Sequence, residues 1–383
     1  MTRMITLFAL AIISLLVIPA SGQEPQPNFS DLPAGVWTEI DVDTGVCLYG
    51  DDYSFFVRPN PTPTNNLVIY FQGGGACWDG LTCGSIGSYA TVFDVYSEQI
   101  NLYTQGIFAL GNQANPIQEA NIVFVPYCSG DLHMGNSQAT FDVPPEAGYS
   151  DPEIDVFFNG FNNSGAVLEW VYANFQSPSR LLISGCSAGG YGALHQAPYI
   201  MEQYSGVPTT IISDAAIGIQ GKNWDGFETW NALSTLPDFI PELANMTTQD
   251  YSTTTHMEIV ARTYPQTNFA QYSSYLDETQ VSFFLSAGGR DLPEDVESTY
   301  FTESAPWSEE LIENTARLSE LPNYRRYIAG GFLHCILNNN FFYAYNEQGV
   351  PFALWFNDVL NGGASDVVCN REDGTCFLQP IDF

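Results

Sequence analysis

Short, continuous apolar runs recur along the chain, and segments rich in Gly, Pro and Asn separate them. Runs of this length without alternation are typical of strands that are buried on both faces of a mainly parallel sheet. We expect strands at residues 53–57, 67–71, 121–125, 180–184, 209–213 and 268–273.

Between these runs, other segments have the periodicity of helices. The clearest helix is expected at residues 164–175, where apolar side chains recur at helical spacing: Val167, Leu168, Val171 and Phe175. Asn162, Asn163 or Ser164 is a candidate cap at its start. A second helix is expected from Ala188 to about Tyr204. Strands that alternate with helices over the whole length, without a repeat of 20 to 50 residues, predict one α/β domain over residues 23–383.

Residues 1–22 differ from the rest and are interpreted as a signal peptide. Arg3 supplies a positive charge, Met4 to Ile18 are almost wholly apolar, and small residues end at Gly22. A membrane anchor would need roughly 20 apolar residues, and this run is shorter. We therefore expect cleavage near Gly22 and a secreted or periplasmic protein without a membrane span.

Eight cysteines in an exported chain indicate disulfides rather than free thiols. Four bridges are expected, with 105 possible connectivities. Cys77 with Cys83, and Cys369 with Cys376, are plausible short loops. A zinc site is disfavoured because the chain has no CxxC and its four histidines are scattered, and no other metal site is assigned.

The net charge of the chain limits the classes of binding partner that we expect. The 383 residues include 10 Lys and Arg against 43 Asp and Glu, so the formal net charge is -33. This charge excludes nucleic acid as an expected partner, because it would repel the phosphates. The hydrophobic content of 45% is far above that of disordered acidic chains and predicts a large core.

The most informative segment is Gly185-Cys-Ser-Ala-Gly189, a G-x-S-x-G motif between a predicted strand and a predicted helix. In this context the serine sits on a sharp turn as a nucleophile, and the backbone N–H of the next residue faces the developing oxyanion. Ser187 is the candidate nucleophile and Ala188 the first oxyanion donor. A Gly-rich packing turn is the alternative.

A nucleophilic serine needs a base that an acid orients, and in α/β-hydrolases these follow in the order Ser, acid, His. His334, in a glycine-bearing loop near the C-terminus, is the best-placed base. Asp214, Asp277 and Asp291 each follow an apolar run, so the pattern leaves the acid open.

A second oxyanion donor is expected in the loop after an early strand. Gly73-Gly-Gly75 follows the predicted strand at 67–71, and three glycines allow close backbone approach to a substrate. Asp131 and His133, in another loop, are equally compatible with lining the substrate cleft and with turn formation.

Together these segments resemble the pectin acetylesterase and Notum family of secreted α/β-hydrolases. The resemblance rests on ordered motifs over roughly residues 47–360: Cys47, Phe71-Gln-Gly-Gly-Gly-Ala-Cys77 with Cys83, Val125-Pro-Tyr-Cys-Ser-Gly-Asp131, Gly185-Cys-Ser-Ala-Gly-Gly190, Asp277-Glu-Thr-Gln280 and His334-Cys335. It implies that Asp277, in the D-x-x-Q stretch, is the catalytic acid, and that Gly74, Gly75 and Ala188 are the oxyanion donors. Gln72 and Ala76 depart from the family pattern beside the pocket, so the resemblance does not identify the substrate.

These observations predict a serine carboxylic-ester hydrolase that needs no cofactor and removes acetyl or other short acyl groups from a small-molecule or polysaccharide ester. A pectin polyanion would be repelled by the acidic protein unless salt or calcium screened the charges. The alternatives are a lipase or polyester depolymerase and a catalytically silent glycan-binding protein.

Overall fold

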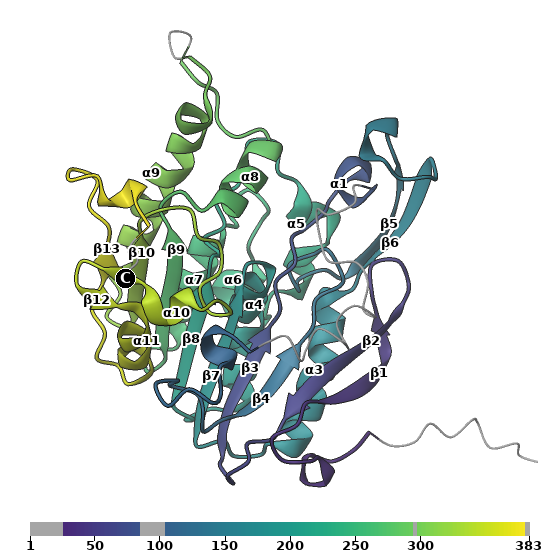
Figure 1. Cartoon of the computed structure of the whole chain (residues 1–383). Helices are drawn as coiled ribbons and strands as arrows, with labels where there is room; N and C mark the ends of the chain where they lie inside the picture. The colour runs from purple at the N-terminus through teal and green to yellow at the C-terminus, as the bar shows by residue number, and fades with distance from the viewer. Residues whose placement is uncertain (1–25, 85–103, 294–296, 380–383) are drawn as a thin grey trace, which may run out of the picture.

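A nine-stranded sheet forms the centre of the molecule, with strand order β1-β2-β4-β3-β7-β8-β9-β10-β13 (Figure 1). The computed structural model describes residues 26–84, 104–293 and 297–379. The predicted signal peptide, residues 1–22, lies outside these residues. Only β1, β2 and β4 meet as antiparallel neighbours, and all other neighbouring strands of this sheet are parallel. The predicted single α/β domain with a mainly parallel sheet is confirmed.

The strands of the large sheet are β1 (Thr38–Val46), β2 (Asp52–Arg58), β3 (Asn66–Phe71), β4 (Asn121–Val125), β7 (Arg180–Cys186), β8 (Thr209–Asp214), β9 (Asn268–Ser274), β10 (Tyr324–Ala329) and β13 (Val367–Val368). Two small antiparallel ribbons pair β5 (Ser137–Asp142) with β6 (Glu153–Phe158), and β11 (Asn346–Glu347) with β12 (Val350–Pro351). All six predicted strands are confirmed, within two residues at each end. The sequence analysis missed β1, which is buried at only two of its nine positions and lacks a continuous apolar run.

The helices that flank the sheet are α1 (Gly80–Gly84), α3 (Gly160–Asn174), α4 (Ala188–Gln203), α5 (Gly226–Thr229), α6 (Pro241–Ala244), α7 (Thr253–Thr263), α8 (Glu278–Ser286), α9 (Tyr300–Leu318), α10 (Phe341–Ala344) and α11 (Phe352–Leu360). The predicted helix at 188–204 is α4, which lies against β3, β7 and β8. Within the described residues, no helix combines the length and the apolar character that a membrane span requires.

The predicted start of the other helix is wrong. Helix α3 begins at Gly160, and its N-cap residue is Asn159. The three candidate caps lie inside the helix, and their side chains contact residues outside α3 instead of capping its first turn. The Asn163 side chain accepts from the Val46 N–H at 3.0 Å and donates to the Val46 carbonyl at 2.8 Å, which joins α3 to the end of β1. Ser164 is fully buried, with its hydroxyl 3.4 Å from Nδ1 of His133.

Four disulfides join all eight cysteines, as predicted. The two short loops are confirmed as Cys77–Cys83 and Cys369–Cys376. The long-range bridges, which the sequence left open, are Cys47–Cys128 and Cys186–Cys335.

The parallel strands place the candidate site residues at one edge of the sheet. The glycine loop follows β3, Ser187 follows β7, Asp214 ends β8, Asp277 follows β9 and His334 follows β10. Because parallel strands end on the same side, residues that are far apart in the sequence meet at the carboxyl edge, where open α/β sheets usually bind ligands.

Candidate active site

Ser187 occupies a strained turn between β7 and α4. Its backbone angles, φ of 57° and ψ of -126°, lie in a region that residues other than Gly rarely adopt. Gly185 and Gly189 have no room for a side chain, because the neighbouring backbone comes too close. A Cβ at Gly185 would lie 2.3 Å from the Gly189 carbonyl oxygen, and one at Gly189 would lie 1.9 Å from the Phe71 carbonyl oxygen. The G-x-S-x-G spacing therefore lets strand, turn and helix pass each other without a clash.

The predicted oxyanion donors lie around this turn. Ala188 is the first residue of α4, so its N–H has no intrahelical acceptor and is available to a ligand. Gly75 and Ala188 line the same pocket as Ser187, and Gly74 stands next to Gly75 in a partly exposed loop. The side chain of Gln72, just before the glycines, accepts from the Tyr127 N–H at 3.1 Å and helps to fix the loop.

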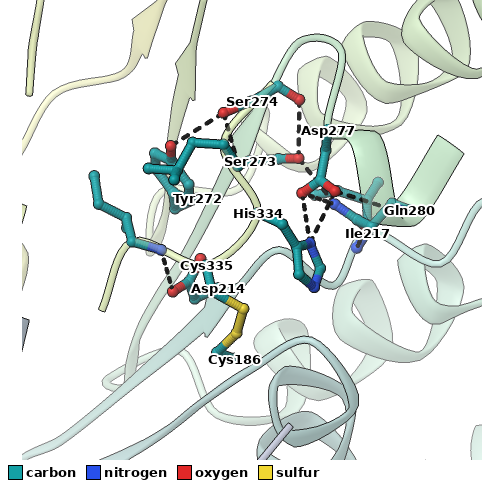
Figure 2. A network of polar contacts seen from close by, with 12 residues as sticks. Cys186, Asp214, Ile217, Tyr272, Ser273, Ser274, Asp277, Gln280, His334 and Cys335 are labelled. Atoms are coloured by element: carbon teal, nitrogen blue, oxygen red, sulfur yellow. Dashed lines mark hydrogen bonds and ion pairs between the residues drawn. A yellow bond between two sulfur atoms is a disulfide. The ribbon is translucent and has the colours of Figure 1, made fainter. Parts of the chain in front are cut away.

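His334 and Asp277 form a direct pair. Nδ1 of His334 lies 2.8 Å from Oδ1 and 3.0 Å from Oδ2 of Asp277, and Figure 2 shows the imidazole ring directed at this carboxylate. The Asp277 side chain is fully buried, whereas that of His334 is 16% exposed. Since a carboxylate only accepts, Nδ1 carries the proton and Nε2 is left as the acceptor.

The charges around His334 favour its protonated form. Burial alone would lower the pKa of His334, but Asp277 opposes this through charge and hydrogen bonding, and Asp214 and Glu278 add smaller contributions. The net effect is a pKa above the ordinary histidine value. The surroundings of His334 thus stabilise its imidazolium form.

Gln280 explains the D-x-x-Q spacing. Asp277 is the N-cap of α8, and its Oδ1 accepts from the Gln280 N–H at 2.9 Å. The Gln280 side chain returns to the carboxylate, with Nε2 2.9 Å from Oδ2, and its Oε1 accepts from the Ile217 N–H at 2.9 Å. Gln280 therefore holds the Asp277 carboxylate and also ties it to the segment after β8.

The other two candidate acids have different partners in the structure. Asp291 is largely exposed and pairs with Lys222. Asp214 is fully buried near the site, but its Oδ2 accepts from the backbone N–H groups of Ile336 and Leu337. In the described part of the chain, Asp277 is the one of the three that forms a hydrogen bond with His334.

Asp131 and His133 serve the loop rather than the cleft. The Asp131 carboxylate accepts from Ser129 Oγ at 2.6 Å and the Gly160 N–H at 2.7 Å, and burial raises its pKa to about 6. Nε2 of His133 lies 2.9 Å from the Gln72 carbonyl oxygen, and burial lowers its pKa to about 4. Neither residue lines the pocket, although Leu132 between them does.

Cys186 and Cys335 lie immediately before Ser187 and immediately after His334, and their disulfide joins the two segments. Potential ligand atoms of Cys186, His334 and Cys335 lie within 4.8 Å of one another. Because the two sulfurs are bonded to each other, neither is a free thiolate ligand, and we assign no metal to this cluster.

A pocket that is partly open to solvent lies over these residues. Ser187 and His334 line it together with apolar and aromatic side chains that the sequence analysis did not identify: Ile219, Trp224, Phe227, Phe283, Phe284 and Trp307. No Asp, Glu, Lys or Arg is among its described lining residues. The wall residues come from segments without a motif, which is why the sequence did not single them out.

Comparison with known proteins places this site in a family. The family model for pectinacetylesterase matches residues 36–287, well over half of the chain. This match includes Ser187 and Asp277, and His334 lies beyond it.

Curated relatives agree with that family. Pectin acetylesterase 11 of Arabidopsis thaliana is 28% identical over 47% of this chain and 44% of its own length. The palmitoleoyl-protein carboxylesterase NOTUM of Schmidtea mediterranea is 26% identical over 39% of this chain and 27% of its own. The palmitoleoyl-protein carboxylesterase notum2 of Xenopus laevis is 30% identical over 39% and 28%. The chain thus spans less than half of the length of these relatives, and it belongs to the pectinacetylesterase family.

Proposed function

We propose that the protein is an exported serine carboxylic-ester hydrolase that works through Ser187, His334 and Asp277. The observation that carries the proposal is the His334–Asp277 pair, whose histidine lines one pocket with a serine on a strained strand-to-helix turn. The family match and the names of the relatives, which are esterases, support the same reaction type.

In the first half of the reaction, the Ser187 hydroxyl attacks the ester carbonyl carbon. Nε2 of His334 takes the hydroxyl proton, and Asp277 stabilises the resulting imidazolium. The N–H groups of Ala188, Gly74 and Gly75 stabilise the oxyanion of the tetrahedral intermediate. When this intermediate collapses, the carbon–oxygen bond to the alcohol breaks, and His334 returns the proton to the leaving alcohol.

In the second half, water attacks the acyl group on Ser187. His334 accepts a proton from the water and then donates it to Ser187 Oγ as the acyl–serine bond breaks. The products are a carboxylic acid and the regenerated enzyme, so the chemistry consumes only ester and water.

The substrate proposed for this site is an acetyl or other short acyl ester of a small molecule or polysaccharide. The pocket presents apolar side chains suited to the uncharged part of an ester. Its described lining offers no Lys or Arg to pair with a carboxylated sugar, and the net charge of -33 repels polyanions. Both observations favour neutral esters over an anionic pectin.

Export of the protein is part of the proposal. The apolar segment before Gly22 has the pattern of a signal peptide, and four disulfides fit an oxidising compartment. Mass spectrometry of the exported protein is expected to give an N-terminus near Gln23. A full-length chain retained in the cytosol would contradict this.

The reaction is tested with purified protein, small acetyl esters and a Ser187→Ala variant. We expect the variant to lose activity and labelling by a fluorophosphonate probe, whereas Ser205→Ala, an exposed serine after α4, retains both. Equal hydrolysis by Ser187→Ala and the unmodified protein would reject the mechanism. A protein that neither hydrolyses esters nor reacts with the probe would instead fit the silent glycan-binding alternative.

A series of esters from two to sixteen acyl carbons, with acetylated polysaccharides beside it, tests the substrate class. We expect the highest kcat/KM for the shortest acyl groups. A maximum at long chains would support the lipase alternative, even if Ser187 proves essential.

A further inference from the structure

Asp214 connects the two segments that carry the nucleophile and the base. It is the last residue of β8, pairs with Cys186 in the parallel register, and is fully buried. Its backbone carbonyl accepts from the Ser187 N–H at 2.8 Å. The main chain of Asp214 therefore holds the nucleophile turn from the β8 side.

The side chain of the same residue holds the histidine loop. Oδ2 accepts from the N–H of Ile336 at 2.9 Å and of Leu337 at 2.8 Å, which are the second and third residues after His334. Figure 2 shows Asp214 beside Cys335 and the Cys186–Cys335 disulfide, apart from Asp277. One buried residue thus forms hydrogen bonds both to the turn that carries Ser187 and to the loop that follows His334.

The charge of Asp214 has no obvious structural use. Its Oδ1 is buried and has no hydrogen-bond partner among the described residues. The ionisable groups that act on it are His334 and Asp277, and it acts in turn on Tyr272 of β9. Burial raises the pKa of Asp214 to about 7, and the charge of His334 opposes this shift, so the carboxylate form is present above neutral pH and is favoured when His334 is protonated.

A neutral amide could accept the same two N–H groups without the cost of burying a carboxylate. The one group nearby that gains from a negative charge is His334 in its protonated form, and Asp214 acts on it in that direction. A carboxylate at this position therefore fits a role in the reaction better than a role in the fold alone.

We propose that Asp214 is a second acidic positioning residue of this site: it clamps the His334 loop to the nucleophile turn, and its charge joins that of Asp277 in stabilising the protonated histidine during proton transfer. This role rests on the proposed esterase function.

Two substitutions separate the clamp from the charge. Asp214→Asn keeps an oxygen that accepts from Ile336 and Leu337 and removes the charge. We expect the acid limb of its kcat/KM profile to move to lower pH, because His334 then loses its proton more easily, with KM nearly unchanged. Asp214→Ala removes both contributions, and we expect kcat to fall by about 100-fold, the scale of a misplaced catalytic group.

Asn121→Ala is the matched control. The Asn121 side chain is buried at the opposite edge of the sheet and also bonds to the backbone, accepting from Asn60 at 2.9 Å and donating to Thr64 at 2.9 Å. This variant is expected to lower the thermal midpoint without moving the acid limb.

The outcomes distinguish this inference from the proposed function. Asp214→Ala with unchanged kcat would overturn the clamp, and Asp214→Asn with an unchanged acid limb would overturn the charge role. If Asp214→Ala does not fold, the acid limb of Asp214→Asn still decides the charge role, and amide hydrogen exchange at Ile336 and Leu337 in the unmodified protein decides the clamp, with unprotected exchange overturning it. Retained activity in Ser187→Ala would instead show that the proposed mechanism itself is wrong.

Discussion

Cys186 is covalently bonded to Cys335, so the residue before Ser187 is tied to the residue after His334. The two cysteines are 149 positions apart in the sequence, and their Cα atoms are 5.6 Å apart. This bridge limits how far the nucleophile turn and the histidine loop can separate. It works in parallel with the hydrogen bonds of Asp214, so the relative position of the two residues has covalent and non-covalent support.

Removing this bridge should affect catalysis as well as stability. For the double variant Cys186→Ser, Cys335→Ser we expect kcat to fall by about 10- to 100-fold, because small displacements of catalytic groups have large effects. Unfolding should become easier by about 2–5 kcal/mol, as for other native disulfides. Steady-state kinetics and denaturant unfolding measure the two effects.

The Cys47–Cys128 bridge provides the control, because neither of its cysteines is next to Ser187 or His334 in the sequence. Its double serine variant should lose stability and keep kcat in the folded fraction. Equal kcat in both double variants would show that the Cys186–Cys335 bridge has no special link to catalysis.

The acid assignment leads to a second prediction. Replacing Asp277 by Asn places an amide opposite Nδ1 of His334 and favours the wrong tautomer, so we expect kcat to fall by about 10⁴-fold. Asp291→Asn changes only an exposed ion pair with Lys222 and should retain full activity. The opposite result for the two variants would transfer the acid role to Asp291.

Gln280 gives a milder test of the same site. Gln280→Ala removes the bonds to the Asp277 carboxylate and to the Ile217 N–H. Because the α8 cap and the bond to His334 persist, we expect a loss of about tenfold in kcat, corresponding to roughly 1.4 kcal/mol. Circular dichroism checks that the fold is intact, and unchanged kcat would show that the acid needs no such support.

The pH profile reports on the charges around His334. The base must be neutral to accept a proton, so kcat/KM rises as pH passes the His334 pKa in the free enzyme. Because that pKa is raised in the folded protein, the acid limb should lie above the ordinary histidine value of about 6.5. Asp277→Asn should move the limb of its residual activity downward, and a wild-type limb below this value would contradict the role of these charges.

Much of this site is predictable from local sequence, but its assembly is not. Ser187 stands out because the close contacts at Gly185 and Gly189 leave a local signature between an apolar strand and a helix. Asp214 and Asp277 both follow buried strands and look equivalent in sequence, since a bond to His334 depends on how β9 and β10 are placed. Only the family resemblance favoured Asp277.

The start of α3 shows that local sequence has the same limit in predicting the fold. The Asn-Asn-Ser segment has the composition of a cap, but Asn163 bonds to Val46 at the end of β1, a partner that is 117 positions away. The wall of the pocket, including Trp224 and Phe284, has no local pattern because its members meet only after folding.

His195 and His256, two of the three buried histidines that lie outside the pocket, predict sensitivity to acid. Burial lowers the pKa of His195 to about 3, with a further contribution from His256, and burial lowers the pKa of His256 to about 4. In the unfolded chain both gain protons near pH 6.5. The folded state binds fewer protons, so the stability that these residues allow is present above that pH and is lost as the pH falls toward 4.

The double variant His195→Gln, His256→Gln cannot take up these protons. Its thermal midpoint should therefore decline less steeply than that of the wild type between pH 6.5 and pH 4. Asp131 and Asp214, with raised pKa values, act in the opposite direction in both proteins, so the difference in slope is the informative quantity. Parallel slopes would remove these two histidines as the cause of acid unfolding.

The division of the pocket into two groups of residues bears on how this enzyme can change. Ser187, Asp277 and His334 are held by the sheet and by the network around Asp214, whereas Ile219, Trp224 and Phe227 belong to the segment after β8 and contribute only wall. Mutations in that segment can reshape the space for the acyl group while the reacting atoms stay in place. We expect substitutions at these wall positions to change the acyl preference with little effect on the positions of Ser187, Asp277 and His334, which makes residues 219–227 the natural region for evolutionary divergence and for directed evolution.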